Sequence, residues 1–309
     1  MKLYIFKKLF LMLLVICLYF QANGQNLDSS YIFDQNAANK MLNSSRRLNI
    51  GGYAQLDYNQ PFGNNEIQNG NLDVHRLVLL FGYNFTNKLS FVTEIELEHV
   101  VEVYVEQAFV NYSLNTYFNF RGGLLLIPMG IINEHHEPTT FNGVERPLID
   151  TYIVPTTWRE LGFGIAGTIP EVSMRYQAYI VNGLASYNGR ALLSGSSGLR
   201  NGRQKGAESF IRFPNFSARA EYYGVLGLNL GLSGFFGKTE STLYDDVNRD
   251  NETEIAVADS SVVGVSMGGF DVRYQRKGVQ LRGQVYYIAL SNTGEYNFLS
   301  ASDNVPNNV

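Results

Sequence analysis

Polar and hydrophobic residues alternate with a period of two along most of the chain, in segments of about ten residues. Residues 88–98 show this clearly, because apolar side chains occupy one side of an extended strand and Glu94, Glu96 and Glu98 the other. After residue 24, no apolar run approaches the roughly 18 residues that a transmembrane helix needs. The pattern is typical of strands in a membrane β-barrel.

The alternation predicts eleven strands and two kinds of connection. The strands are expected near residues 48–58, 73–84, 88–98, 102–114, 117–127, 160–168, 171–182, 214–223, 226–237, 262–275 and 278–290. Long polar connections alternate with tight ones, except that the connection at 99–101 is short. Outer-membrane barrels have long loops outside and short turns inside. We therefore predict an all-β fold, a transmembrane antiparallel β-barrel, with a secreted soluble β protein as the alternative.

The odd number of strands conflicts with the even number usual in single-chain bacterial barrels. Residues 301–309 read as a loop and lack a closing strand that ends in an aromatic residue. We expect the barrel to be C-terminally incomplete in this sequence. The alternative is that one strand has been split or two have been merged.

The first 24 residues resemble a secretory signal peptide. Lys2, Lys7 and Lys8 precede an apolar stretch from Leu9 to Phe20, and small residues stand before Gln25. The sole cysteine, Cys17, lies inside this segment, so disulfide and thiol chemistry are not expected in the exported chain. The predicted organisation is a signal peptide (1–24), a periplasmic N-terminal segment that is a tail or short helix (25–46) and the barrel (47–309).

Composition excludes one class of partner. The formal net charge is −4, which argues against nucleic-acid binding through bulk charge. Among the 24 basic residues, 16 are Arg and 8 are Lys. Arg presents a rigid, permanently charged fork to carboxylates and phosphates.

Several motifs resemble the phosphate-selective porin O/P family in their order and spacing. They are Arg121-Gly-Gly-Leu-Leu-Leu-Ile-Pro-Met-Gly130, Asn133-Glu-His-His-Glu-Pro138, Phe141-Asn-Gly-Val-Glu-Arg-Pro147, Pro155-Thr-Thr-Trp-Arg-Glu-Leu-Gly162, Gly52-Tyr-Ala-Gln-Leu-Asp57 and Gly227-Leu-Asn-Leu-Gly-Leu-Ser233. The resemblance implies a sixteen-stranded barrel, usually a trimer, that passes small anions, so that five strands would be missing here. This chain departs from the family in having only five scattered Lys after residue 24. The resemblance therefore implies general porin function for this chain, but it leaves open whether the pore selects phosphate.

The third outer connection, residues 128–159, is the predicted constriction loop. A long loop without regular structure is usually functional, and in porins such a loop can fold into the barrel and narrow it. The candidate residues in it are Pro128, Glu134, His135, His136, Arg146 and Trp158. The alternative is a surface loop packed at the barrel mouth.

Arg residues on several strands are predicted to line the pore. Five of them lie within a few residues of one depth, which suggests an Arg band in the periplasmic half: Arg121, Arg175, Arg219, Arg273 and Arg282. Arg76 and Arg159 complete the basic set. Arg273 faces inward only if Gly268 and Gly269 form a bulge, because Val263, Val265 and Met267 set the opposite phase. The alternatives are that these Arg residues pair with carboxylates, or cap the barrel at the headgroup level.

An acidic wall is expected opposite the Arg band. Glu94, Glu96 and Glu98 share one face of their strand, and Glu102 and Glu106 lie on the next. The two walls would set up a transverse field that salt screens over about 8–10 Å. Equally, Glu96 or Glu98 could pair with Arg76.

Metal and cofactor sites are not predicted. Adjacent residues such as His135 and His136 point apart on an extended chain, which favours a polar loop over a metal site. Asp245, Asp246, Asp250 and Glu252 form an acidic outer loop, for which solvation is favoured over divalent-ion binding between lipopolysaccharide groups.

These features favour an outer-membrane porin, a passive channel for small hydrophilic solutes and above all anions such as phosphate. The expected partners are such anions, membrane lipid, lipopolysaccharide and two further copies in a homotrimer. The alternative is a closed structural or surface-binding barrel without pore activity. A barrel enzyme such as a hydrolase is not expected, because His75 and His99 lie near strand ends outside any nucleophile motif.

Overall fold

The computed structural model describes residues 36–63, 67–135, 146–301 and 307–309. The predicted signal peptide, Cys17 and His136 lie outside these residues. No helix among the described residues is long and apolar enough to cross a membrane.

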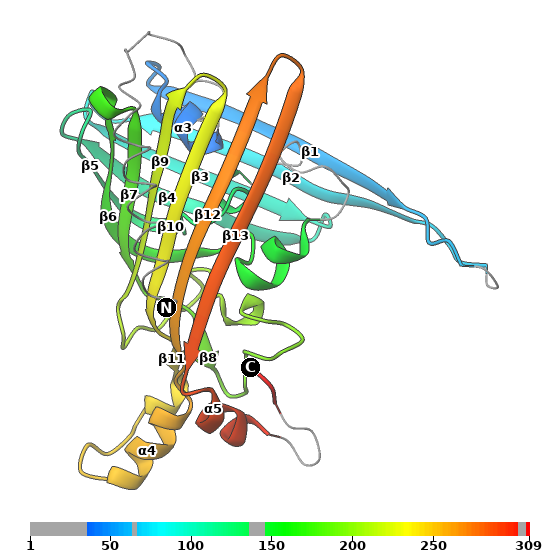
Figure 1. Ribbon diagram of the computed structural model, residues 1–309, viewed down its shortest axis with the longest axis vertical. Helices are drawn as coiled ribbons and strands as arrows, with labels where there is room; N and C mark the ends of the chain where they lie inside the picture. The colour runs from blue at the N-terminus through cyan, green and yellow to red at the C-terminus, as the bar shows by residue number, and fades with distance from the viewer. Residues whose placement is uncertain (1–35, 64–66, 136–145, 302–306) are drawn as a thin grey trace, which may run out of the picture.

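Eleven strands form one antiparallel sheet in which each strand pairs with its neighbours in sequence (Figure 1). They are β1 (Leu48–Asn59), β2 (Asn71–Asn84), β3 (Leu89–Glu98), β4 (Glu102–Ser113), β5 (Asn119–Leu126), β6 (Arg159–Ile169), β7 (Met174–Val181), β9 (Asn215–Val225), β10 (Leu228–Lys238), β12 (Gly264–Arg276) and β13 (Val279–Ser291). All eleven predicted strands are present. Among the described residues β1 and β13 are the edges of the sheet and do not pair with each other.

The two faces of the sheet have opposite chemistry. The outer face carries exposed apolar side chains, including Phe163 at 63%, Val285 at 61% and Tyr287 at 77% exposure. The inner face carries buried charged and polar side chains, among them Arg76, Glu94 and Asp271. A protein folded in water shows the reverse distribution, so this sheet is inside out.

Tight turns gather at one end of the sheet and long connections at the other, except that the short turn after β3 lies at the loop end. The turn end holds the short links after β2, β4, β6, β9 and β12, including the 3-10 turn η4 (Pro170–Val172). The connections that leave the loop end contain η1 (Asn133–His135), η3 (Ile149–Ile153), β8 (Ala185–Tyr187), η5 (Arg200–Gly202), β11 (Glu240–Ser241), η6 (Thr242–Tyr244), α4 (Glu252–Ser260) and α5 (Thr293–Ser300). β8 and β11 form a separate parallel pair, and α4 and α5 lie beyond the end of the sheet (Figure 1). The sequence pattern did not predict α4, α5, β8 or β11.

The N-terminal segment ends in a short helix, α3 (Ala37–Leu42), packed on the inner face of β2 and β3. The Asn36 side chain caps this helix by accepting the Asn39 backbone N–H at 2.8 Å. Met41 packs against the buried side chains of Val78 and Leu80. A Cβ at Gly82 would stand only 2.9 Å from Met41 Cβ, so this glycine makes room for the helix.

β12 corrects one prediction. The strand pairs with β10 and β13 without any register shift, so Gly268 and Gly269 form no bulge. Arg273 nevertheless faces inward, because Val265 and Met267 also face inward and join the buried apolar cluster. The expected phase was wrong because apolar residues on this strand pack against other buried apolar side chains instead of facing outward.

Candidate functional site

An ion-pair network lies on the inner face of β7, β9 and β12, with Arg219 at its centre. Its guanidinium donates to both carboxylate oxygens of Asp271, at 2.7 and 2.9 Å, and to Glu221 at 2.9 and 3.1 Å. Asp271 lies two strands away, across β10. A Cβ at the intervening Gly231 would come within 2.4 Å of Arg219 Nη2, so this glycine leaves the space through which Arg219 reaches Asp271.

Two further guanidinium groups contact the Glu221 carboxylate. Arg273 donates to it at 2.7 Å, and Arg175, its cross-strand neighbour, stands at 3.2 Å. Three residues of the predicted Arg band are therefore matched by carboxylates. Glu221 and Asp271 could not be assigned to the site from the sequence pattern, because the partners across a sheet depend on register.

The other two residues of the predicted band lie on the same inner face. Arg121 donates to Asn111 and to the Tyr179 hydroxyl, both at 3.1 Å. Arg282 is half-buried on β13, directly opposite Arg273. Both are thus placed where the sequence pattern expected them.

Two of the glutamates on β3 and β4 form ion pairs with Arg residues of β2 and β6. Arg76 pairs with Glu96 at 3.1 Å and Arg159 with Glu106 at 2.8 Å, and all four side chains are almost fully buried. Gln107 donates to Glu94 at 2.7 Å, while Glu98 lies opposite Arg76 at the strand end. The predicted Arg76–Glu96 pair is confirmed. These ion pairs offset part of the negative charge of the predicted acidic wall.

The described part of the 128–159 segment lies against inward-facing side chains. The Ile131 N–H donates to Gln284 on β13 at 3.3 Å, and Gln284 in turn donates to Asp150 at 2.7 Å. Glu134 accepts from Gln177 on β7 at 2.6 Å. Burial raises the pKa of Glu134, and it raises the pKa of Asp150 to about 6.

Asn133 and Trp158 hold the two ends of this segment together. The Asn133 amide donates to the carbonyls of Ile127 and Trp158, at 2.8 and 2.9 Å, and its oxygen accepts the Trp158 backbone N–H at 2.7 Å. The buried Trp158 indole donates to Glu160 at 3.1 Å. Pro128 is also buried, whereas Arg146 is half-buried where the described chain resumes.

The connection between β7 and β9 contains further basic residues, which were not among the predicted site residues. Arg200 and Arg203 both donate to the Thr156 carbonyl, Arg200 at 3.5 Å, so two guanidinium groups converge on one oxygen. Lys205 lies 5.3 Å from the centre of the Tyr104 ring, with the Arg159 guanidinium 5.9 Å from the same ring. Burial and the charge of Arg200 lower the pKa of Arg203 to about 9. The clustered basic residues 200–205 were the available sequence signal.

At the turn end the inner face borders a cavity of about 450 Å³. Its lining includes α3, Arg121, Arg175, Gln177 and His135. Most of the cavity lining is polar. The acidic outer loop lies at the opposite end, where Asp245, Asp246 and Asp250 are exposed.

Comparisons with known proteins add little about activity. No family model matches the chain. An uncharacterized protein of Aquifex aeolicus (strain VF5) is 39% identical over 214 residues, which cover 66% of this chain and 48% of that protein. The chain thus spans about half the length of the curated relative that it matches.

Among solved structures, two forms of OmpT, an outer membrane protein of Vibrio cholerae, are similar at low scores. The in-vitro folded trimer form gives a TM-score of 0.39 at 10% identity, covering 81% of this chain and 80% of its own. The loop L8 deletion mutant gives 0.35 at 9% identity, covering 79% and 83%. These TM-scores are too low to establish a shared topology.

Proposed function

We propose that this protein is an outer-membrane β-barrel pore for small hydrophilic solutes, related to the phosphate-selective porin O/P family. The observation that carries the proposal is the inside-out sheet. Apolar side chains such as Phe163 and Val285 are exposed on one face, while Arg76, Glu96 and Arg219 are buried on the other. Lipid favours the first face and a polar lumen the second.

The proposal requires the sheet to close. Unpaired backbone groups at a sheet edge are too costly inside lipid. We infer that the edges of β1 and β13 are paired in the membrane. Trimer formation is part of the same proposal.

The residues best placed to favour anions are Arg200, Arg203 and Lys205. Carboxylates match Arg175, Arg219 and Arg273 within the sheet, so the predicted Arg band contributes less free positive charge than its count suggests. In contrast, Arg200 and Arg203 share a carbonyl oxygen and repel each other. An anion passing beside them would reduce this repulsion. Arg and Lys side chains line the pores of anion channels in the same way.

The test is the reversal potential of the purified protein in a planar bilayer under a KCl gradient. The natural protein should conduct with a preference for chloride, and the double variant Arg200→Gln/Arg203→Gln should shift the reversal potential toward that of potassium. Arg190→Gln, an exposed position in the same connection, is the matched control and should not shift it. A cation-selective natural protein, or a double variant that behaves like the control, would contradict the anion assignment.

A closed barrel without pore activity is the second candidate. It is favoured by the burial of residues 128–134 and 154–159 and by the paired charges on both walls. A folded protein that inserts into bilayers without any conductance would select this candidate.

A further inference from the structure

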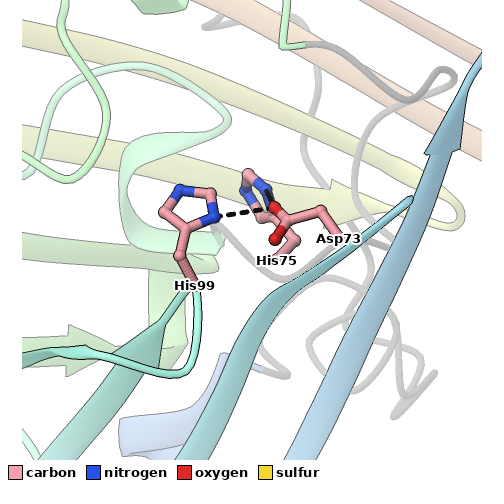
Figure 2. A group of neighbouring side chains, drawn as sticks. All are labelled: Asp73, His75 and His99. Carbon is pink, nitrogen blue, oxygen red and sulfur yellow. Dashed lines mark ion pairs between the residues drawn. The ribbon is translucent and has the colours of Figure 1, made fainter. Parts of the chain in front are cut away.

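Three side chains with metal-ligating atoms converge at the loop end of β2 and β3 (Figure 2). His99 Nδ1 lies 2.7 Å from Asp73 Oδ2, and His75 Nδ1 lies 3.7 Å from the same oxygen. One ligand atom from each residue lies within 4.8 Å of the others. A fourth side chain, Asp57 on β1, places its Oδ2 3.6 Å from His75 Nδ1.

An irregularity in the β1–β2 pairing directs these residues to one face. Gln55 pairs with Arg76 but Asp57 pairs with Asp73, so β2 contains one extra residue opposite Leu56. This β-bulge lets both Asp73 and His75 lie on the less exposed side, while Leu56 and Val74 are exposed. Bulges commonly re-aim side chains in this way.

The turn between β3 and β4 supplies the third residue. His99 and Val100 have φ values of 50° and 69°, a left-handed conformation that β-branched residues such as Val100 strongly disfavour. The His99 backbone N–H donates to the His75 carbonyl at 3.3 Å, which fixes the turn against β2. The imidazole of His99 is thereby held over Asp73.

The charges in the cluster favour a cation. Asp57 and Asp73 are direct cross-strand partners, and like charges in that position repel. Arg76 is adjacent, but its guanidinium is paired with the buried Glu96 at 3.1 Å. A divalent ion between the two carboxylates and the two imidazoles would offset their repulsion.

We propose that Asp73, His75 and His99 bind a divalent transition-metal ion of the Zn²⁺ type, while Asp57, 3.6 Å from His75, adds negative charge beside the site. Ligands at about 2.0–2.1 Å from a tetrahedral ion stand about 3.3–3.4 Å from one another. The His75–Asp73 contact, at 3.7 Å, is close to this spacing. The His99–Asp73 contact, at 2.7 Å, opens by about half an ångström to reach it. The ion would hold β2 and the β3–β4 turn together at the loop end of the sheet, whether or not the protein conducts.

The experiment titrates Zn²⁺ into the detergent-folded protein by calorimetry and records the visible spectrum with Co²⁺. The natural protein should bind one ion per chain and give the strong absorption bands of low-coordinate Co²⁺. His99→Asn and His75→Gln should each weaken Zn²⁺ binding by about 100-fold, since even outer-shell changes cost 10–100-fold. Asn tolerates positive φ, so His99→Asn should keep the turn.

The matched control is Asp245→Asn/Asp246→Asn, which removes two exposed carboxylates from another connection at the same end. It should bind Zn²⁺ like the natural protein. Folding of each variant is checked by its electrophoretic mobility without boiling. If one histidine variant fails to fold, Zn²⁺ binding by the other histidine variant tests the proposal. The proposal is overturned if millimolar Zn²⁺ gives no binding, or if the folded histidine variants keep the natural affinity.

Discussion

Single residues decide whether charge can be buried on the inner face. Arg219 is 3% exposed, and it is stabilised there by Glu221 and Asp271. Breaking such a pair typically costs more than replacing it whole, because one charge is left uncompensated. Gly231 is as important as the charged residues, since any side chain there would occupy the path between Arg219 and Asp271.

Asp150 gives a pH-dependent prediction at the same scale. Burial raises its pKa from 3.8 to about 6, so the folded protein favours the neutral carboxyl. Its stabilising contribution is therefore complete below about pH 4 and is lost as pH rises through about 6. The free energy of unfolding of the natural protein minus that of Asp150→Asn should fall over this interval and then level off.

Urea unfolding followed by the fluorescence of Trp158, the single Trp, measures this difference. Asp245→Asn, at an exposed position, should follow the natural protein at every pH. A difference that is constant or that increases with pH would contradict the assigned role of Asp150.

At the scale of elements, the 128–159 segment depends on one amide. Asn133→Ala removes three hydrogen bonds to buried backbone groups of Ile127 and Trp158. The two carbonyls keep their bonds from the Ile127 and Met129 N–H groups, whereas the Trp158 N–H is left unsatisfied. One unsatisfied buried group costs roughly 1–3 kcal/mol and each of the two other lost bonds about 0.5–1.5 kcal/mol, so we expect a loss of about 3 kcal/mol in unfolding free energy. Asn87→Ala, in the exposed β2–β3 turn, should cost less than about 0.5 kcal/mol by the same urea measurement. Equal losses for the two variants would show that Asn133 does not hold the segment.

Strands were predictable from sequence because the alternation has a single period, and all eleven appear. The face of the sheet toward which each side chain points was harder to predict, as β12 shows. Val265 and Met267 are apolar but face inward, because other buried apolar side chains cover them there. Alternation reports which residues share a face, and packing decides which face is inside.

The candidate site was predictable in part. The inward Arg residues followed from strand position, but their partners required the register, which places Glu221 beside Arg175 and Asp271 beside Gly231. His75 and His99 were placed near strand ends, yet their approach to Asp73 depends on a bulge and a strained turn. No local pattern in the sequence encodes either feature.

For the whole molecule, the central claim is that the outer face of the sheet lies in lipid. Nitroxide labels at Phe163→Cys and Val285→Cys test it, with Cys17 replaced by Ser and the protein folded into lipid vesicles. Both positions are exposed on the outer face, and Asp245→Cys in the loop region is the aqueous control. We predict that the labels at 163 and 285 are accessible to oxygen and shielded from a water-soluble nickel chelate, whereas the label at 245 shows the reverse. Labels at 163 and 285 as accessible to the nickel chelate as that at 245 would contradict the claim.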